Sequence, residues 1–110
     1  MALTFEGREL ALDERGYLVH ADDWTERLAM HMAALDGIAL GAEHWAVIRF
    51  LRRYHAEFRS APGMRLLLKA LAAELGPEWG QSRRLYQLFP DGPAKQACRY
   101  AGLPKPVSCI

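Results

Sequence analysis

The chain lacks the features that anchor a protein in a membrane, export it or cross-link it. It has two cysteines among 110 residues. Its richest apolar run, Leu66 to Leu75, is interrupted by Lys69 and Glu74, so no segment is a membrane-span candidate. Charged residues between Glu6 and Glu9 interrupt the first apolar residues, which argues against a secretory signal. The length predicts one domain, residues 1–110. The absence of a membrane segment and of a secretory signal predicts the reducing cytoplasm.

The spacing of metal ligands is also missing. The two cysteines, Cys98 and Cys109, are separated by ten residues and form no Cys-x-x-Cys pair. None of the four histidines lies at the close spacing expected of a structural zinc site. We therefore expect neither a metal nor a cofactor.

Charge is unevenly distributed along the chain, although the net charge is only +1. Residues 1–44 carry nine acidic and three basic side chains, whereas residues 45–110 carry four acidic and eleven basic ones. The second part therefore has a positive field able to attract an acidic partner or nucleic acid. A solvated helix surface is the alternative explanation.

The first 37 residues predict a small β element followed by a helix. Residues 3–5 and 8–12 flank Glu6-Gly7 as in a short hairpin, and a turn at 13–16 precedes a further extended segment at 17–19. Asp23, with Glu26 three residues later, matches a capping box at the start of a helix that ends at Gly37.

Four more helices are predicted from apolar spacing and from the prolines and glycines that limit them. They cover about residues 43–58, 62–75, 83–89 and 93–101. Gly102 ends the last helix, and Pro104 and Pro106 hold their predecessors in extended geometry, so residues 102–110 are expected to form a C-terminal arm. The expected fold class is mostly α (α+β): about five helices, an N-terminal β-hairpin and a mobile arm.

Cys109 is the predicted reactive residue. A penultimate residue on a proline-stiffened arm cannot join a core unless the whole arm docks, so its thiol is expected to be accessible. Lys105 and the basic second part of the chain favour the thiolate if the arm folds back, whereas the α-carboxylate of Ile110 opposes it.

Cys98 has two interpretations. It shares one face of the last helix with three alanines, as a small buried core residue would, and local chemistry favours this role. Lys95, three residues earlier, would instead stabilise a thiolate. A turn at Gly102 leaves a reversible Cys98–Cys109 disulfide open to the chain.

The last nineteen residues carry a specific resemblance. The segment GPAKQACRYAGLPKPVSCI is similar to the C-terminal arm of the DsrC/TusE family, small sulfur-relay proteins also called the sulfite reductase gamma subunit. Similar segments occur along nearly the whole chain: Gly16-Tyr17-Leu18, Asp23-Trp24, Glu43-His44-Trp45, Arg49-Phe50-Leu51-Arg52 and Leu85-Tyr86-Gln87-Leu88-Phe89-Pro90. One difference is Pro77-Glu78-Trp79, where the resemblance leads us to expect a more charged segment. The resemblance implies the family's helical domain with a hairpin and a mobile arm, and a persulfide on Cys109.

The resemblance leaves two relay roles. Family members devoted to tRNA thiolation typically keep only the cysteine matching Cys109, whereas members of dissimilatory sulfur metabolism carry a second one matching Cys98. Having both, this chain is expected to be a DsrC-like carrier that holds sulfur in a trisulfide and acts as a protein co-substrate, with sulfite reductase and a membrane redox complex as partners. The alternative is a TusE-like sulfurtransferase that links TusBCD-type relay proteins to a tRNA thiolase for wobble-uridine 2-thiolation.

Two functions of other classes compete with sulfur relay. The segments at 62–75 and 83–89, joined by a short turn containing glycine, would form a DNA-binding helix-turn-helix with Arg83 and Arg84. However, apolar residues already occupy one face of the short second helix, and two arginines neutralise few phosphates. Direct nucleic-acid binding is therefore disfavoured. A purely structural subunit is the third class, against which the accessible thiol of Cys109 argues.

Overall fold

The computed structural model describes residues 1–106 of the chain. It begins with an antiparallel hairpin, in which β1 (Ala2–Phe5) pairs with β2 (Arg8–Ala11). Glu6 and Gly7 form the turn with φ angles of 52° and 77°, the left-handed conformation that a two-residue hairpin turn requires. The N-terminal hairpin predicted from the sequence is confirmed.

Helices make up most of the remaining described chain. They are η1 (Ala21–Asp23), α1 (Glu26–Leu35), α2 (Ala42–Phe58), α3 (Met64–Leu75), η2 (Pro77–Gly80), α4 (Ser82–Leu88) and α5 (Pro93–Tyr100), where η denotes a 3-10 helix. The five α-helices match the five predicted ones, which confirms the mostly α fold. None of the helices in residues 1–106 combines the length and the apolar character needed to cross a membrane.

Helix α1 begins later than the capping-box pattern predicts. Thr25 is its N-cap, and the Thr25 Oγ1 accepts a hydrogen bond from the Leu28 amide at 3.0 Å. Asp23 instead ends η1, and its carboxylate pairs with Arg8 of β2 at 3.0 Å. The predicted start was wrong because two capping residues lie two positions apart, and the ion pair with the hairpin engages the first of them.

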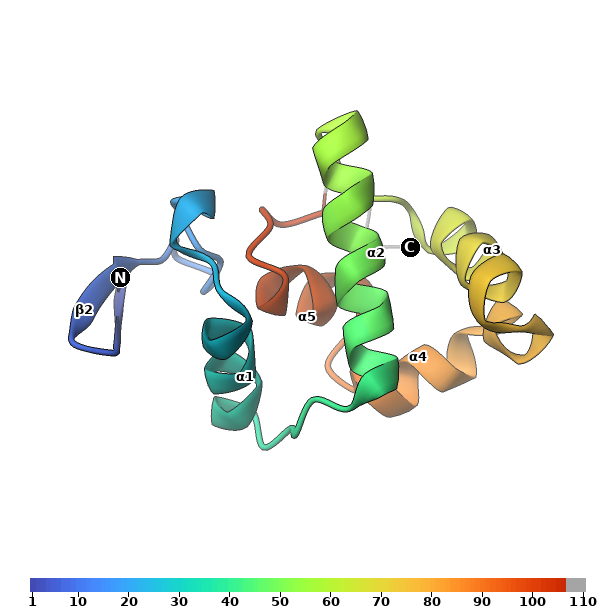
Figure 1. The fold of residues 1–110 in the computed structure, drawn as a ribbon, viewed down its shortest axis with the longest axis horizontal. Coiled ribbons are helices and arrows are strands. Elements are labelled where there is room, and N and C mark those ends of the chain that lie inside the picture. The colour runs from blue at the N-terminus through green and yellow to red at the C-terminus, as the bar shows by residue number, and fades with distance from the viewer. Residues whose placement is uncertain (107–110) are drawn as a thin grey trace.

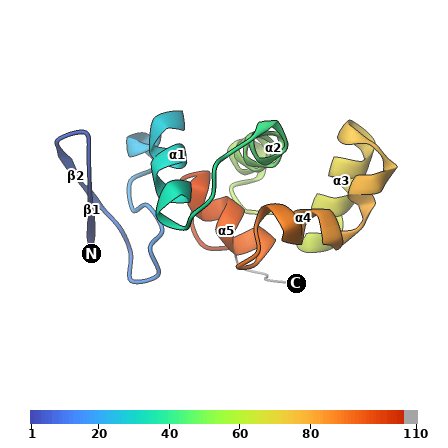
Figure 2. The same cartoon turned by 90° about the horizontal axis from the view of Figure 1, so that it is seen from below.

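Helix α5 is enclosed by the other helices. It contacts α1, α2 and α4, and Figures 1 and 2 show it between α1 on one side and α2 and α4 on the other. Its buried residues are Pro93, Ala94, Gln96, Ala97, Cys98 and Tyr100. The small side chains in this set let the neighbouring helices approach closely, so the alanine face predicted from the sequence serves packing.

Helices α2 and α3 contribute aliphatic side chains such as Leu51 and Leu71 to the core, which also contains Leu28 of α1 and Leu85 of α4. Phe58 and Leu75, which continue the same apolar stripes, are 55% and 38% exposed because they lie in the last turns of their helices. Trp79 of η2 is only 3% exposed. The Pro77-Glu78-Trp79 segment therefore contributes a buried ring to the side of the core formed by α3 and α4.

Candidate functional site at the root of the arm

Cys109, the predicted sulfur carrier, lies outside the described residues, and its role stays a prediction. The structure places the segment that leads to it, residues 101–106, which we call the root of the arm. The root lies against the body of the protein, since Ala101, Gly102, Leu103 and Pro106 are buried and only Pro104 is exposed.

A Schellman motif turns the chain back at the end of α5. Gly102, with a φ of 71°, donates its amide to Arg99 O at 3.2 Å, and the Leu103 amide donates to Cys98 O at 3.0 Å. These two bonds satisfy carbonyl groups that the helix leaves open at its C-terminus. The direction of the arm is therefore set by the last turn of α5.

Two side chains hold this turn in place, and we call them the Trp24–Arg52 clamp. Trp24 Nε1 donates to Tyr100 O at 2.7 Å, and Arg52 Nη1 donates to Ala101 O at 2.6 Å. The Arg52 guanidinium also stacks on the Trp24 ring, with 3.8 Å between Cζ and the ring centroid. A cation at this position is favoured both by the aromatic face and by the negative end of the α5 dipole.

Gly102 contacts the clamp directly. A Cβ atom at this position would overlap the side chain of Trp24, and the positive φ independently disfavours any other residue. Glycine is thus required here both for the backbone conformation and for the close approach of the ring.

Cys98 is a core residue in this structure. Its side chain is 0% exposed, and burial raises the pKa of the thiol to about 12. Lys95, which the sequence suggests as a partner for a thiolate, is exposed and lines a surface pocket. At neutral pH Cys98 is therefore a neutral thiol shielded from solvent, and its pairing with Cys109 stays a prediction.

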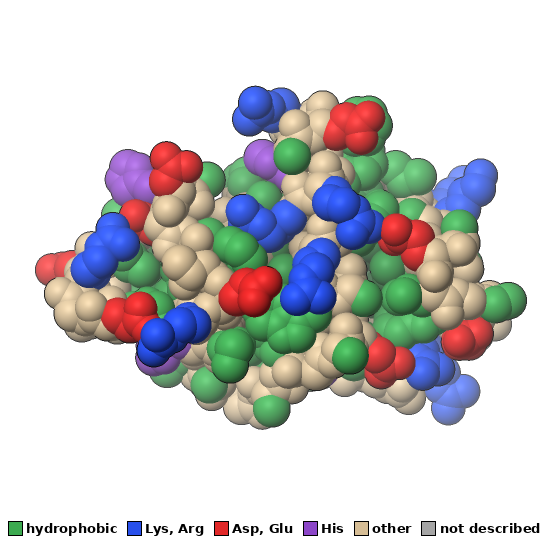
Figure 3. All heavy atoms as spheres, in the orientation of Figure 1, with side chains coloured by type: hydrophobic (Ala, Val, Ile, Leu, Met, Phe, Trp, Pro, Cys, Tyr) green, Lys and Arg blue, Asp and Glu red, His purple; other side chains and the backbone are tan. Residues whose placement is uncertain are grey.

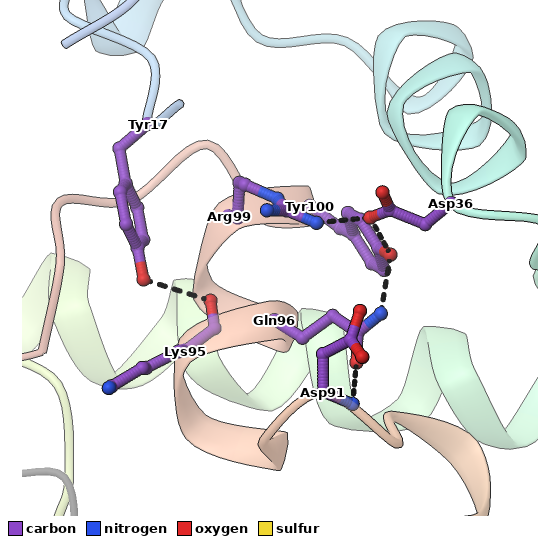
Figure 4. A network of polar contacts seen from close by, with 7 residues as sticks. All are labelled: Tyr17, Asp36, Asp91, Lys95, Gln96, Arg99 and Tyr100. Atoms are coloured by element: carbon purple, nitrogen blue, oxygen red, sulfur yellow. Dashed lines mark hydrogen bonds and ion pairs between the residues drawn. The ribbon is translucent and has the colours of Figure 1, made fainter. Parts of the chain in front are cut away.

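A network of hydrogen bonds fixes α5 to its surroundings (Figure 4). The Tyr100 hydroxyl donates to Asp36 Oδ2 at 2.6 Å and accepts from Gln96 Nε2 at 2.8 Å. Gln96 Oε1 in turn accepts from the Asp91 amide at 2.9 Å, and Arg99 pairs with the Asp36 carboxylate. Burial, reinforced by Asp36, raises the pKa of Tyr100 to about 12. The network ties the end of α1 to the helix that carries the arm.

A basic pocket of about 200 Å³ opens beside this network. It is lined by Arg15, Tyr17, Asp91, Lys95, Gln96, Arg99 and Lys105. Three of its four cations, Arg15, Lys95 and Lys105, form no ion pair within residues 1–106. Lys95 extends beneath Tyr17, on the side of α5 away from Asp36 (Figure 4). The sequence did not predict the pocket, because Arg15 is far from Lys95, Arg99 and Lys105 in the chain and no local pattern joins them.

The exposed face of α2 has a mixed charge. Figure 3 shows Lys and Arg side chains over this face with acidic side chains among them. Arg53 pairs with Glu74 at 2.8 Å, and Arg49 lies 3.6 Å from Glu26. Such pairs reduce the positive field that the sequence count of residues 45–110 suggests.

The DNA-binding alternative finds little support in this geometry. Arg84 pairs with Glu43 at 2.9 Å and lies over the Trp79 ring, so it is engaged within the protein. Leu85 and Phe89 are 0% exposed and hold α4 in the core. Within the part of the chain that the structure describes, no group of three or more His, Cys, Asp or Glu side chains is arranged to hold a metal ion.

Comparison with known proteins gives consistent similarities along the whole chain. A family model described as "DsrC like protein" matches residues 4–110. Sulfurtransferase TusE of Salmonella typhimurium is 55% identical over 108 residues, which cover 98% of this chain and 99% of that protein. Sulfurtransferase TusE of Escherichia coli K12 is 53% identical with the same coverage.

Solved structures also resemble the chain over its whole length. The NMR structure of Allochromatium vinosum DsrC is 50% identical with a TM-score of 0.88. The crystal structure of the oxidised gamma-subunit of the dissimilatory sulfite reductase (DsrC) from Archaeoglobus fulgidus is 40% identical with a TM-score of 0.89. In both comparisons the match covers 100% of each chain.

Proposed function

Because the chain belongs to the DsrC-like protein family, whose model matches residues 4–110, we propose that it is a sulfur carrier that binds sulfur as a persulfide on Cys109 and relays it to a partner protein. The family itself was predicted from the arm sequence, and that prediction is confirmed. The persulfide, and the residue that carries it, are the proposal.

Of the two relay roles, similarity favours the one in tRNA thiolation. The proteins named sulfurtransferase TusE are 53% to 55% identical over nearly the full length, and this observation carries the proposal. We therefore assign the chain a TusE-like role in the cytoplasm, receiving sulfur from TusBCD-type relay proteins and passing it to a tRNA thiolase for wobble-uridine 2-thiolation. This assignment replaces the dissimilatory role expected from the pair of cysteines.

The position of Cys98 supports the same choice. A thiol attacks a persulfide only as a thiolate, and the thiolate of Cys98 is disfavoured by complete burial. A trisulfide or disulfide at Cys98 would require α5 to expose a side chain that is 0% accessible. A relay that uses Cys109 alone requires no such rearrangement.

The chemistry of the proposed relay is exchange between thiols and persulfides. The Cys109 thiolate attacks the outer sulfur of a donor persulfide, a new S–S bond forms, and the donor cysteine leaves as a thiolate. The acceptor thiolate then attacks the outer sulfur on Cys109 and restores the Cys109 thiolate. No electrons are gained or lost overall, so the protein acts as a co-substrate whose body positions the arm.

Loading can be tested directly. The protein is incubated with a persulfide-bearing donor, and the modified cysteine is identified by peptide mass spectrometry. We expect the added sulfur on Cys109 and no loading of the Cys109→Ser variant. Sulfur on Cys98 alone, or equal loading of both proteins, would contradict the assignment.

The acceptor is tested in cells. Deleting the gene should deplete 2-thiouridine from tRNA, measured by mass spectrometry of nucleosides, and a plasmid copy of the wild type or of Cys98→Ala should restore it while Cys109→Ser should not. Unchanged 2-thiouridine after deletion would instead favour the second candidate, a DsrC-like role in dissimilatory sulfur metabolism. That candidate draws on the presence of both cysteines and on the similarity to DsrC structures.

A further inference from the structure

The basic pocket at the root of the arm points to a docking site for the loaded arm. We propose that Arg15, Lys95 and Lys105 bind the persulfide of Cys109 in its anionic form, so that residues 107–110 dock when sulfur has been loaded and dock weakly when it has not. The inference rests on the proposed persulfide at Cys109 and adds a position and a charge dependence to it.

The charge of the pocket is the first argument. Arg15, Lys95 and Lys105 converge on one pocket without an ion pair in the described residues. The remaining cation, Arg99, is already engaged by Asp36, and Asp91 is the only carboxylate that residues 1–106 contribute to the lining. Like charges held close together repel one another, so a bound anion stabilises the pocket.

The length of the chain is the second argument. Lys105 is both a wall of the pocket and a residue of the arm, and Cys109 follows four positions later. A fully extended chain covers about 3.3 to 3.6 Å per residue, so Cys109 stays within roughly 14 Å of Lys105. A pocket of about 200 Å³ has room for a side chain that ends in two sulfur atoms.

The pocket is expected to bind the loaded arm in preference to the empty one because a persulfide and a thiol differ in acidity. A free cysteine has a pKa near 8.5 and is mostly neutral at pH 7. A persulfide is more acidic than the corresponding thiol, because the second sulfur spreads the negative charge, so loading converts a mostly neutral side chain into an anion. The α-carboxylate of Ile110 is present in both states, so loading adds a second negative charge to the arm. Three cations without ion-pair partners in the described chain therefore bind the loaded arm more strongly than the empty one.

The first test uses NMR on the full chain, loaded with inorganic polysulfide and checked by intact mass. We expect the amide signals of Arg15, Lys95 and Lys105 to shift on loading, while those around Lys69, an exposed lysine of α3, stay in place. Failure of Cys109 to take up sulfur would overturn the proposed function. Loading without shifts at the pocket would overturn only the docking site.

The second test measures how fast a neutral alkylating reagent reacts with the persulfide. Docking protects the sulfur, so Lys95→Gln and Arg15→Gln should each raise the rate about threefold at low ionic strength, as expected for one exposed cation. Lys69→Gln is the matched control and should react like the wild type. The differences should disappear in high salt and in unloaded protein. Equal rates for all loaded proteins, or an equal effect on the unloaded thiol, would overturn the proposal.

Discussion

At the scale of single residues, burial determines what each thiol can do. In the unfolded chain Cys98 ionises near pH 8.5, whereas in the folded protein burial raises its pKa to about 12. Between these two values the unfolded state loses a proton that the folded state keeps. The contribution of the buried thiol to stability is therefore complete below about pH 8.5 and is lost as the pH rises towards 12.

Cys98→Ala tests this pH dependence. At neutral pH the variant should lose about 1 kcal/mol of unfolding free energy, because a small cavity replaces the sulfur. Above pH 9 its stability should fall less steeply than that of the wild type, measured by the midpoint of chemical denaturation at several pH values. Cys109→Ala serves as the control and should keep the wild-type slope. An unchanged slope in Cys98→Ala would mean that the thiol ionises freely in the fold.

At the scale of elements, the caps determine where helices begin and how the chain leaves them. Thr25 caps α1, although Asp23 fits the more familiar capping-box pattern. Gly102 ends α5 in a left-handed conformation against the ring of Trp24. Each position therefore gives a testable prediction, and a variant at a nearby or similar residue provides the control.

Thr25→Ala should destabilise the protein by about 1 kcal/mol, because the Leu28 amide loses its hydrogen-bond acceptor. Asp23→Ala should cost less, roughly 0.5 kcal/mol, since it removes an ion pair whose Arg8 partner is 66% exposed. Urea denaturation of the two variants measures both losses. A larger loss for Asp23→Ala would restore the capping-box interpretation.

Gly102→Ala should be much more harmful than the same change at Gly37. Gly37 has a φ of 79° and open space where the methyl group of an alanine would lie, so its substitution costs only the backbone strain, about 1 kcal/mol. At Gly102 the methyl group also displaces Trp24, which brings the expected loss to roughly 3 kcal/mol. Thermal denaturation gives the comparison, and near-UV circular dichroism should change only for Gly102→Ala. Similar losses at the two sites would show that the ring moves away at little cost.

At the scale of the whole molecule, stability is concentrated around α5. This helix contacts α1, α2 and α4, whereas the hairpin is a two-stranded sheet at one end of the molecule (Figure 2). A two-stranded sheet is only marginally stable by itself, and Leu10 is the only residue of β1 and β2 that is buried in the core. The two regions are therefore expected to open independently.

Hydrogen exchange measured by NMR should show this difference. The amides of α5 should exchange only through global unfolding, while those of β1 and β2 should exchange through local opening and at least roughly tenfold faster. Adding a low concentration of urea should accelerate α5 exchange strongly and hairpin exchange weakly. Equal protection in both regions would indicate one cooperative unit that includes the hairpin.

Features that depend on local sequence signals were predictable, whereas features that depend on contacts between distant parts of the chain were not. Apolar spacing and the prolines and glycines that limit helices are local signals, and they predict the five helices and the hairpin. Apolar spacing did not predict the exposure of Phe58 and Leu75, because it shows which residues share a helix face and not whether the fold covers the end of the helix. The Asp36–Tyr100 bond and the basic pocket join residues that are far apart in the chain. The family was predictable because the arm sequence is distinctive, whereas the burial of Cys98 required its neighbours in space.

The central position of α5 also has a consequence for biosynthesis. The helices α1, α2 and α4, which α5 contacts, all precede it in the chain, so their apolar faces stay uncovered on the ribosome until residues 93–103 have been made. The nascent chain therefore completes its core late, and Cys109 is added only six residues after Leu103. During translation Cys109 is therefore added soon after the residues that complete the core. A chain that stops before α5 would lack both the thiol and a complete core.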